Sequence, residues 1–121
     1  MPQIVSDIVE VVLFRFHRNV PVYLLLRRSI TEMLYPGSWQ IVTGTVHEPE
    51  TALQAALRET LEETGLVPER FWALPFTGSF YDHATDRVRI APFFLGQVGI
   101  AKLAGVLTFT HGNTFNQRGK R

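Results

Sequence analysis

Three glutamates gather on one predicted helix. Glu59, Glu62 and Glu63 stand at i, i+3 and i+4 in the stretch ALQAALRETLEETG. At about 100° per residue, these positions share one face of a helix, where like charges repel. Mg²⁺ typically binds a few carboxylates together with substrate phosphates. The cluster therefore predicts a site for a hard divalent cation. The alternative is a surface helix whose glutamates are only solvated.

The flanking residues predict where this helix begins and ends. Pro49 suits a first turn, where its missing N–H costs nothing, and Gly65 suits the position just after a helix. We therefore expect a helix at residues 49–64. Its other face is apolar and is expected to pack on the core through Ala52, Leu53, Ala55, Ala56, Leu57, Thr60, Leu61 and Thr64.

The spacing around the glutamates resembles the Nudix box. The matching positions are Gly44, Glu50, Arg58-Glu59, Glu62-Glu63 and Gly65-Leu66. Two residues depart from the family pattern. Thr60 stands where the family prefers an aliphatic residue, and Pro49 stands where relatives often carry glycine. The resemblance runs from Val5 to Val98 and is most specific in WQIVTG and the box after it.

This resemblance implies an α/β (α+β) fold, a Nudix-type α/β/α sandwich in which a mixed sheet carries the box helix. Runs of β-branched and aromatic residues agree, and they predict a hairpin of residues 4–17 and 22–27, a short strand at 39–43, and strands at 71–80, 88–98 and 106–110. Breaks are expected at Pro75 and Gly78 and near Pro92. The family usually closes with another helix, which we expect to be missing because the sequence from Gly99 onward shows no helical period.

The length of 121 residues predicts a single domain, placed at residues 1–110, with a poorly ordered basic tail at 111–121. No acidic residue comes after Asp86, so a carboxylate ligand has to come from the preceding part. The net charge is +1 and there is no cysteine, which favours neither a nucleic-acid polymer as partner nor a thiolate metal site. We see no signal peptide or membrane-length run, so we expect no membrane association and a cytoplasmic location.

The resemblance also implies a metal site. Mg²⁺, with Mn²⁺ as a substitute, would be bound by Glu59, Glu62 and Glu63, and the backbone carbonyl of Thr43 could add a ligand. Family members differ in which carboxylate accepts the proton of the attacking water. Glu59 and Glu62 are therefore both candidates for the general base.

Other box residues have supporting roles in this interpretation. Arg58, which we group with the catalytic residues, is expected to hold the helix and the preceding loop together by pairing with Glu50. The positions expected to be structural are Gly44, Glu50 and Gly65.

Substrate contacts are expected outside the box. Arg27 and Arg28 end a predicted strand and could bind phosphate oxygens by forked hydrogen bonds, although a solvated strand end explains them too. Tyr81 could stack on a base, although a polar hairpin tip is an equal explanation.

The implied reaction is attack of water on a nucleoside diphosphate linked to another group. The run from WQIVTG through the helix is similar to the dATP pyrophosphohydrolase branch, which includes dihydroneopterin triphosphate hydrolases. A (d)NTP giving NMP and pyrophosphate is therefore the expected substrate. Two alternatives are a non-catalytic nucleotide-binding or regulatory module and a diphosphate isomerase, which normally needs a cysteine absent here. An apolar sheet edge could be buried in a homodimer.

Overall fold

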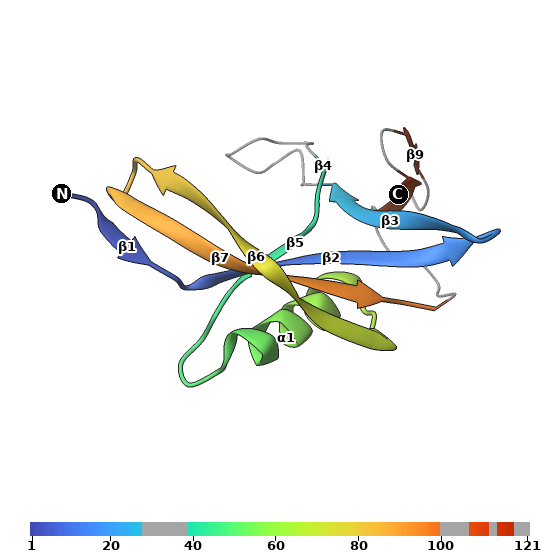
Figure 1. The fold of residues 1–121 in the computed structure, drawn as a ribbon, viewed down its shortest axis with the longest axis horizontal. Coiled ribbons are helices and arrows are strands. Elements are labelled where there is room, and N and C mark those ends of the chain that lie inside the picture. The colour runs from blue at the N-terminus through green and yellow to red at the C-terminus, as the bar shows by residue number, and fades with distance from the viewer. Residues whose placement is uncertain (28–38, 100–106, 112–113, 118–121) are drawn as a thin grey trace.

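The computed structural model describes residues 1–27, 39–99, 107–111 and 114–117. These residues form a twisted sheet with one helix, α1 (Ala52–Thr64), packed against it (Figure 1). The strands are β1 (Gln3–Val5), β2 (Ile8–His17), β3 (Val20–Arg27), β4 (Trp39–Gln40), β5 (Val42–Thr45), β6 (Arg70–Asp82), β7 (Arg87–Gln97), β8 (Leu107–His111) and β9 (Thr114–Gln117).

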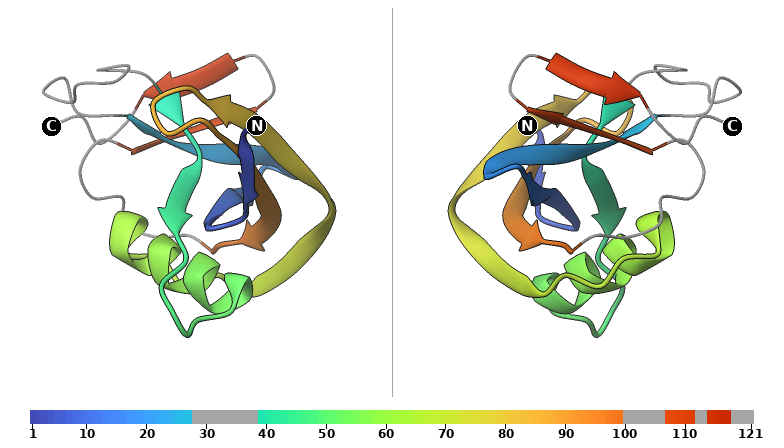
Figure 2. Two further views of the ribbon diagram at one scale, coloured as in Figure 1. Left: turned by 90° about the vertical axis from the view of Figure 1, so that its left-hand side faces the viewer. Right: turned by 90° about the vertical axis from the view of Figure 1, so that its right-hand side faces the viewer.

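The sheet is mixed, as predicted, and β2 is its central strand. The order is β1-β7-β2-β3-β8-β9, with β4 beside β3, β5 beside β2 and β6 beside β7. β7 runs parallel to β1 and β2, and the remaining pairs are antiparallel. Seen along its length, the sheet curls, with α1 and the β8–β9 hairpin at opposite sides of the view (Figure 2). The mixed sheet carrying the box helix confirms the predicted fold, and α1 is the only helix within the described ranges.

The predicted β2–β3 hairpin is present, but its turn is tighter than expected. Arg18 and Asn19 both have positive φ, 52° and 65°, and His17 pairs with Val20. This is the pattern of a two-residue type I′ turn, whose twist matches that of the flanking strands. The second strand therefore begins at Val20 rather than at Val22.

The three breaks predicted in the later strands, at Pro75, at Gly78 and near Pro92, are absent. β6 continues from Arg70 to Asp82, with Gly78 paired to Ala91, because a shift in register between Ala73 and Thr77 accommodates Pro75. β7 continues through Pro92. The pairing of β7 with β2 begins one residue later, at Phe93, so the missing N–H of Pro92 costs no hydrogen bond to β2. Conversely, the strand predicted at 39–43 is divided into β4 and β5.

One short strand lies near the end of the chain. β9 falls within residues 111–121 and pairs with β8, and the poorly ordered tail expected at 111–121 stays a prediction. Its sequence TFNQ begins with a β-branched and an aromatic residue, which suit a strand. Residues 118–121 lie outside the described ranges, and the domain boundary at residue 110 stays a prediction.

The helix α1 begins later than predicted and ends where predicted. Thr51 is the N-cap: its side chain accepts a hydrogen bond from the Gln54 amide, and the Gln54 side chain accepts one from the Thr51 amide. This capping box satisfies free amides of the first turn, so Pro49 precedes the helix. Gly65, with φ of 75°, ends it. No helix in the described part of the chain has the length and apolar character needed to cross a membrane.

The buried face of α1 is narrower than predicted. Small residues of the predicted face are buried, namely Ala55, Ala56, Thr60 and Thr64. The three leucines also expected there, Leu53, Leu57 and Leu61, are 48, 39 and 51% exposed. Thr60 and Thr64 are buried because their hydroxyls donate to the carbonyls four residues earlier, at 2.7 and 2.6 Å. The core comprises Val9, Val11, Leu13, Val22, Leu24, Val42, Ala55, Ala56, Leu66, Phe94 and Val98.

Candidate active site

Gly44 on β5 leaves room for the carboxyl group of Glu59. A Cβ atom added to Gly44 would lie 2.1 Å from Cδ of Glu59 and 2.5 Å from its Oε2. The same oxygen accepts a hydrogen bond from the amide of Thr45 at 3.2 Å. Glycine is required here because the Glu59 carboxyl occupies the space that a side chain would fill.

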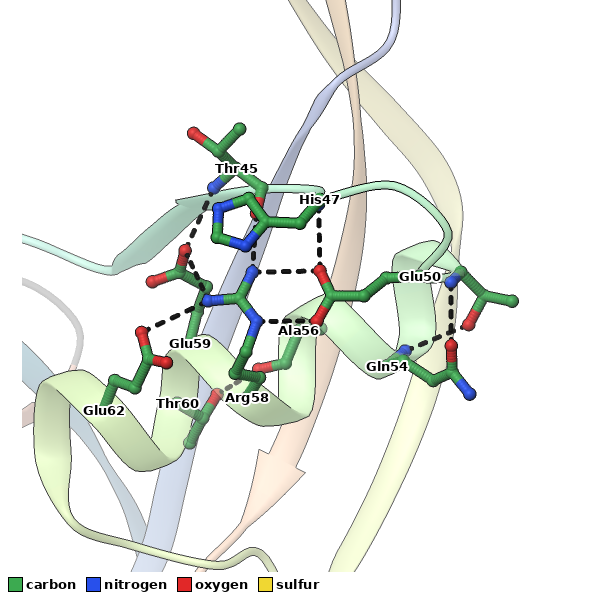
Figure 3. A network of polar contacts seen from close by, with 10 residues as sticks. Thr45, His47, Glu50, Gln54, Ala56, Arg58, Glu59, Thr60 and Glu62 are labelled. Atoms are coloured by element: carbon green, nitrogen blue, oxygen red, sulfur yellow. Dashed lines mark hydrogen bonds and ion pairs between the residues drawn. The ribbon is translucent and has the colours of Figure 1, made fainter.

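Arg58 connects the loop before α1 to the carboxylates on α1 (Figure 3). Its Nε and Nη2 donate to Glu50 at 2.6 and 3.0 Å, a bidentate pair, and Nη2 also donates to the carbonyl of Thr45 at 2.8 Å. Nη1 donates to Glu59 at 3.3 Å and to Glu62 at 3.2 Å. The pairing of Arg58 with Glu50 is thus observed, and the same guanidinium also offsets charge on two of the clustered glutamates.

The surroundings of Glu50 and Arg58 keep both side chains charged. Hydrogen bonds from Arg58 and from the backbone amide of His47 lower the pKa of Glu50 to about 2. The pKa of Arg58 is raised further above its ordinary value, chiefly by its hydrogen bond to Glu50. Both partners are therefore ionised throughout the physiological range of pH.

Glu63 has a different environment from its two neighbours. Although the residue is exposed overall, its carboxyl group is partly removed from water and shares a hydrogen bond with Glu59. Loss of water, that hydrogen bond and the charges of Glu59 and Glu62 raise the pKa of Glu63 to about 8, against the opposing effect of the Thr43 amide. At neutral pH the cluster therefore retains a proton that a cation would displace.

The donor chemistry of this cluster fits a hard divalent cation, although its present geometry is not a closed ligand set. Among the described residues, no three His, Asp or Glu side chains converge closely enough to hold an ion as they stand. The reason lies in the contacts above, since Arg58 draws Glu59 and Glu62 towards itself and Glu63 holds a proton. A cation would replace that proton and part of the arginine pairing.

Thr43 connects the cluster to the other face of the sheet. Its backbone amide contacts Glu63, and its hydroxyl donates to Oε1 of Glu10 on β2 at 2.7 Å. Burial raises the pKa of Glu10, and the Thr43 hydrogen bond opposes that shift. The sequence reasoning missed Glu10, although an acidic residue inside the apolar run IVEVVLF was a signal for it.

The predicted substrate residues are not brought into this cluster by the described contacts. The Tyr81 hydroxyl donates to Asp86 at 2.8 Å at the end of the β6–β7 hairpin, which agrees with the structural alternative. Arg27 is the last residue of β3 and pairs with Trp39. The side chain of Arg27 and the whole of Arg28 lie outside what the structure describes.

Comparisons with known proteins identify the family of this chain. The family model for the NUDIX domain matches residues 6–104, so the chain belongs to the NUDIX domain family. An RNA pyrophosphohydrolase of Hydrogenovibrio crunogenus is 38% identical over 79 residues, which are 62% of this chain and 48% of that protein. The chain therefore spans about half the length of this curated relative.

Solved structures of the same family share the fold. A MutT/nudix family protein from Enterococcus faecalis matches with a TM-score of 0.69 at 22% identity, covering 97% of this chain and 51% of that one. The NUDIX domain of Shewanella oneidensis NrtR, solved with ADP ribose, matches with a TM-score of 0.67 at 20% identity, covering 92% and 73%.

Proposed function

We propose that this chain is a Mg²⁺-dependent Nudix pyrophosphohydrolase that cleaves a nucleoside triphosphate. Water attacks a phosphorus of the triphosphate, the bridging P–O bond breaks, and NMP and pyrophosphate are released. The observation that supports this proposal most is the position of the Glu59 carboxyl group against Gly44, where it contacts Thr45 and Arg58. Glu63 shares a hydrogen bond with Glu59, and Glu62 accepts from the same Arg58 nitrogen. A helix whose glutamates were only solvated would not need that fit.

Each residue of the cluster would have its own part in the reaction. Glu59, Glu62 and Glu63 would hold the cation, with the backbone carbonyl of Thr43 as a further oxygen ligand. When bound, Mg²⁺ or Mn²⁺ would neutralise the diphosphate and lower the pKa of a water. Glu59 or Glu62 would accept the proton of the attacking water, and Arg58 would keep both carboxylates in position.

A nucleotide panel tests this proposal. The protein is incubated with the common NTPs and dNTPs and Mg²⁺, and the products are separated by ion-exchange chromatography. We expect NMP and pyrophosphate in equal amounts from at least one substrate, with turnover reduced at least a hundredfold in Glu62→Gln. Glu69→Gln removes an exposed carboxylate outside the cluster and serves as the matched control. Release of NDP and phosphate, or binding of nucleotide without turnover, would refute the proposal, and the second result would favour a non-catalytic module.

A second candidate substrate is the 5′-triphosphate end of RNA. The name of the Hydrogenovibrio relative, at 38% identity, favours it. The chemistry at phosphorus is the same, so the two candidates differ only in whether an RNA chain is attached to the first nucleotide. Comparing kcat/KM for a free NTP and for a short 5′-triphosphorylated RNA distinguishes them, since a polymer-specific enzyme would prefer the RNA at least tenfold.

A further inference from the structure

Glu10 is a carboxylate within the apolar run of β2. Its neighbours along β2, Val9 and Val11, are fully buried in the core beneath α1. Because side chains alternate along a strand, Glu10 points to the opposite face of the sheet. The same argument places Thr43 and Phe93 there, since Val42 and Phe94 lie in the core.

These three residues form one row across the sheet. Glu10 pairs with Thr43 on β5 and with Phe93 on β7, so the three side chains stand beside one another on the same face. Each is only partly buried, so the row is accessible to solvent. Thr43 also contacts Glu63 through its backbone amide, which places one end of the row directly at the candidate cation site.

The ring of Phe93 is held in place by its neighbours. It packs against Phe76 with ring centroids 5.3 Å apart, and a Cβ on Gly78 would lie 2.7 Å from its Cε1. Phe76 is itself 55% exposed. The row therefore ends in an aromatic surface on which a heteroaromatic ring could stack, a contact worth about 1–3 kcal/mol for a base.

The carboxyl group of Glu10 has acceptor capacity that the described residues leave unused. Only the Thr43 hydroxyl donates to it among the described side chains, and it takes Oε1. Arg89, a cation on the neighbouring strand β7, is already paired with Asp7 and Asp82. A carboxylate offers about four acceptor positions and suits two parallel N–H donors.

We propose that Glu10 selects the base of the substrate by accepting two adjacent N–H donors from the ring edge while the ring lies against Phe93. Guanine presents such a pair, N1–H and the 2-amino group, whereas adenine presents an acceptor beside its amino group. This inference rests on the proposed function, because it assumes that the triphosphate lies at the glutamate cluster. It assigns guanine nucleotides, or rings with the same donor edge, as the preferred substrate class.

The test compares substrates rather than absolute rates. We expect kcat/KM of the unaltered protein to favour GTP over ATP at least tenfold, with ITP, which lacks the 2-amino group, between them. Glu10→Gln should lower kcat/KM for GTP at least tenfold and change that for ATP less than threefold. The matched control Glu48→Gln, at an exposed carboxylate, should preserve the GTP preference.

Binding measured alongside separates this inference from the proposed function. Equilibrium dialysis of GDP and ADP gives the same ratio without turnover, so a protein that binds GDP selectively but hydrolyses nothing would refute the hydrolase and retain Glu10 as the selecting residue. Equal affinity for GDP and ADP, or an unchanged ratio in folded Glu10→Gln, would overturn the inference. If Glu10→Gln unfolds, Glu10→Asp replaces it as the test variant, because aspartate keeps the negative charge on a shorter side chain. An unchanged GTP preference in Glu10→Asp would also overturn the inference.

Discussion

Substitution of Gly44 by alanine tests whether the position of the Glu59 carboxyl group is needed for metal binding and hydrolysis. The new Cβ would lie 2.1 Å from Cδ of Glu59, and an ordinary contact begins at 3.4 Å, so the carboxyl group has to move by more than 1 Å. The side chain can turn away, at a cost of about 0.5–1.5 kcal/mol for a strained rotamer. Losing the hydrogen bond from the Thr45 amide adds about 1 kcal/mol.

The expected loss of stability is therefore about 1–3 kcal/mol, which a thermal melt detects as a fall of several degrees. The expected loss of function is larger, because a displacement of about 1 Å in a catalytic group can cost about a hundredfold in rate. Mn²⁺ affinity, measured by electron paramagnetic resonance, should fall at least tenfold. NTP hydrolysis should fall about a hundredfold.

Gly65→Ala is the matched control. Gly65 has φ of 75° and no atom within 4 Å of an added Cβ, so alanine there strains the backbone, by about 1–2 kcal/mol, without touching Glu59. It should lose comparable stability and keep Mn²⁺ affinity within threefold. If Gly44→Ala remains folded with unchanged Mn²⁺ affinity and turnover, the fit of Glu59 against Gly44 has no functional meaning.

Three further predictions concern the same helix. The pKa of Glu63 is raised to about 8 in the folded protein from an ordinary 4.5. Between pH 4.5 and about 8 the folded state therefore holds a proton that the unfolded chain has lost, so the free energy of unfolding should decrease as pH rises through this range. Glu63→Gln should flatten that decrease in denaturant titrations. A bound cation has to displace the proton on Glu63, so the Mn²⁺ affinity of the unaltered protein should rise towards pH 8. Arg58→Lys should lower turnover at least tenfold because an ammonium group cannot reproduce the bidentate pair with Glu50, and turnover equal to that of the unaltered protein would contradict this role. Thr60→Val removes a buried hydroxyl that bonds only to its own helix, so the free energy of unfolding should change by about 1 kcal/mol or less with turnover unchanged, whereas a larger loss would show that the hydroxyl is needed.

The sequence was sufficient for the parts of the fold set by local chemistry. Fixed spacing identified the box helix, Gly65 marked its end, and β-branched runs marked the strands. The pairing of Arg58 with Glu50 was expected from family resemblance and is present in the structure. These features depend on residues close together in the chain, which is why pattern alone was enough.

Features set by tertiary contacts were harder to predict. Hydrophobicity placed Leu53, Leu57 and Leu61 on the buried face of α1 together with its alanines and threonines, but only the small residues are buried. The buried threonine hydroxyls bond to carbonyls of their own helix, as Thr60 does to Ala56. Pro75 was wrongly expected to break a strand. The register shift that accommodates this proline depends on pairing with β7, so residues next to Pro75 in the sequence do not reveal it. Glu10 was missed because its importance comes from Thr43, which is 33 residues away along the chain.

NTP hydrolysis measured while the metal is removed and then restored tests directly whether the glutamate cluster binds a catalytic cation. We expect turnover to vanish in excess EDTA and to return on addition of Mg²⁺ or Mn²⁺ in the unaltered protein and in Glu69→Gln. Glu62→Gln should stay at least a hundredfold slower while melting within a few degrees of the unaltered protein. Hydrolysis that persists in excess chelator, or full activity in Glu62→Gln, would contradict the assignment of the glutamate cluster as a cation site that drives the reaction.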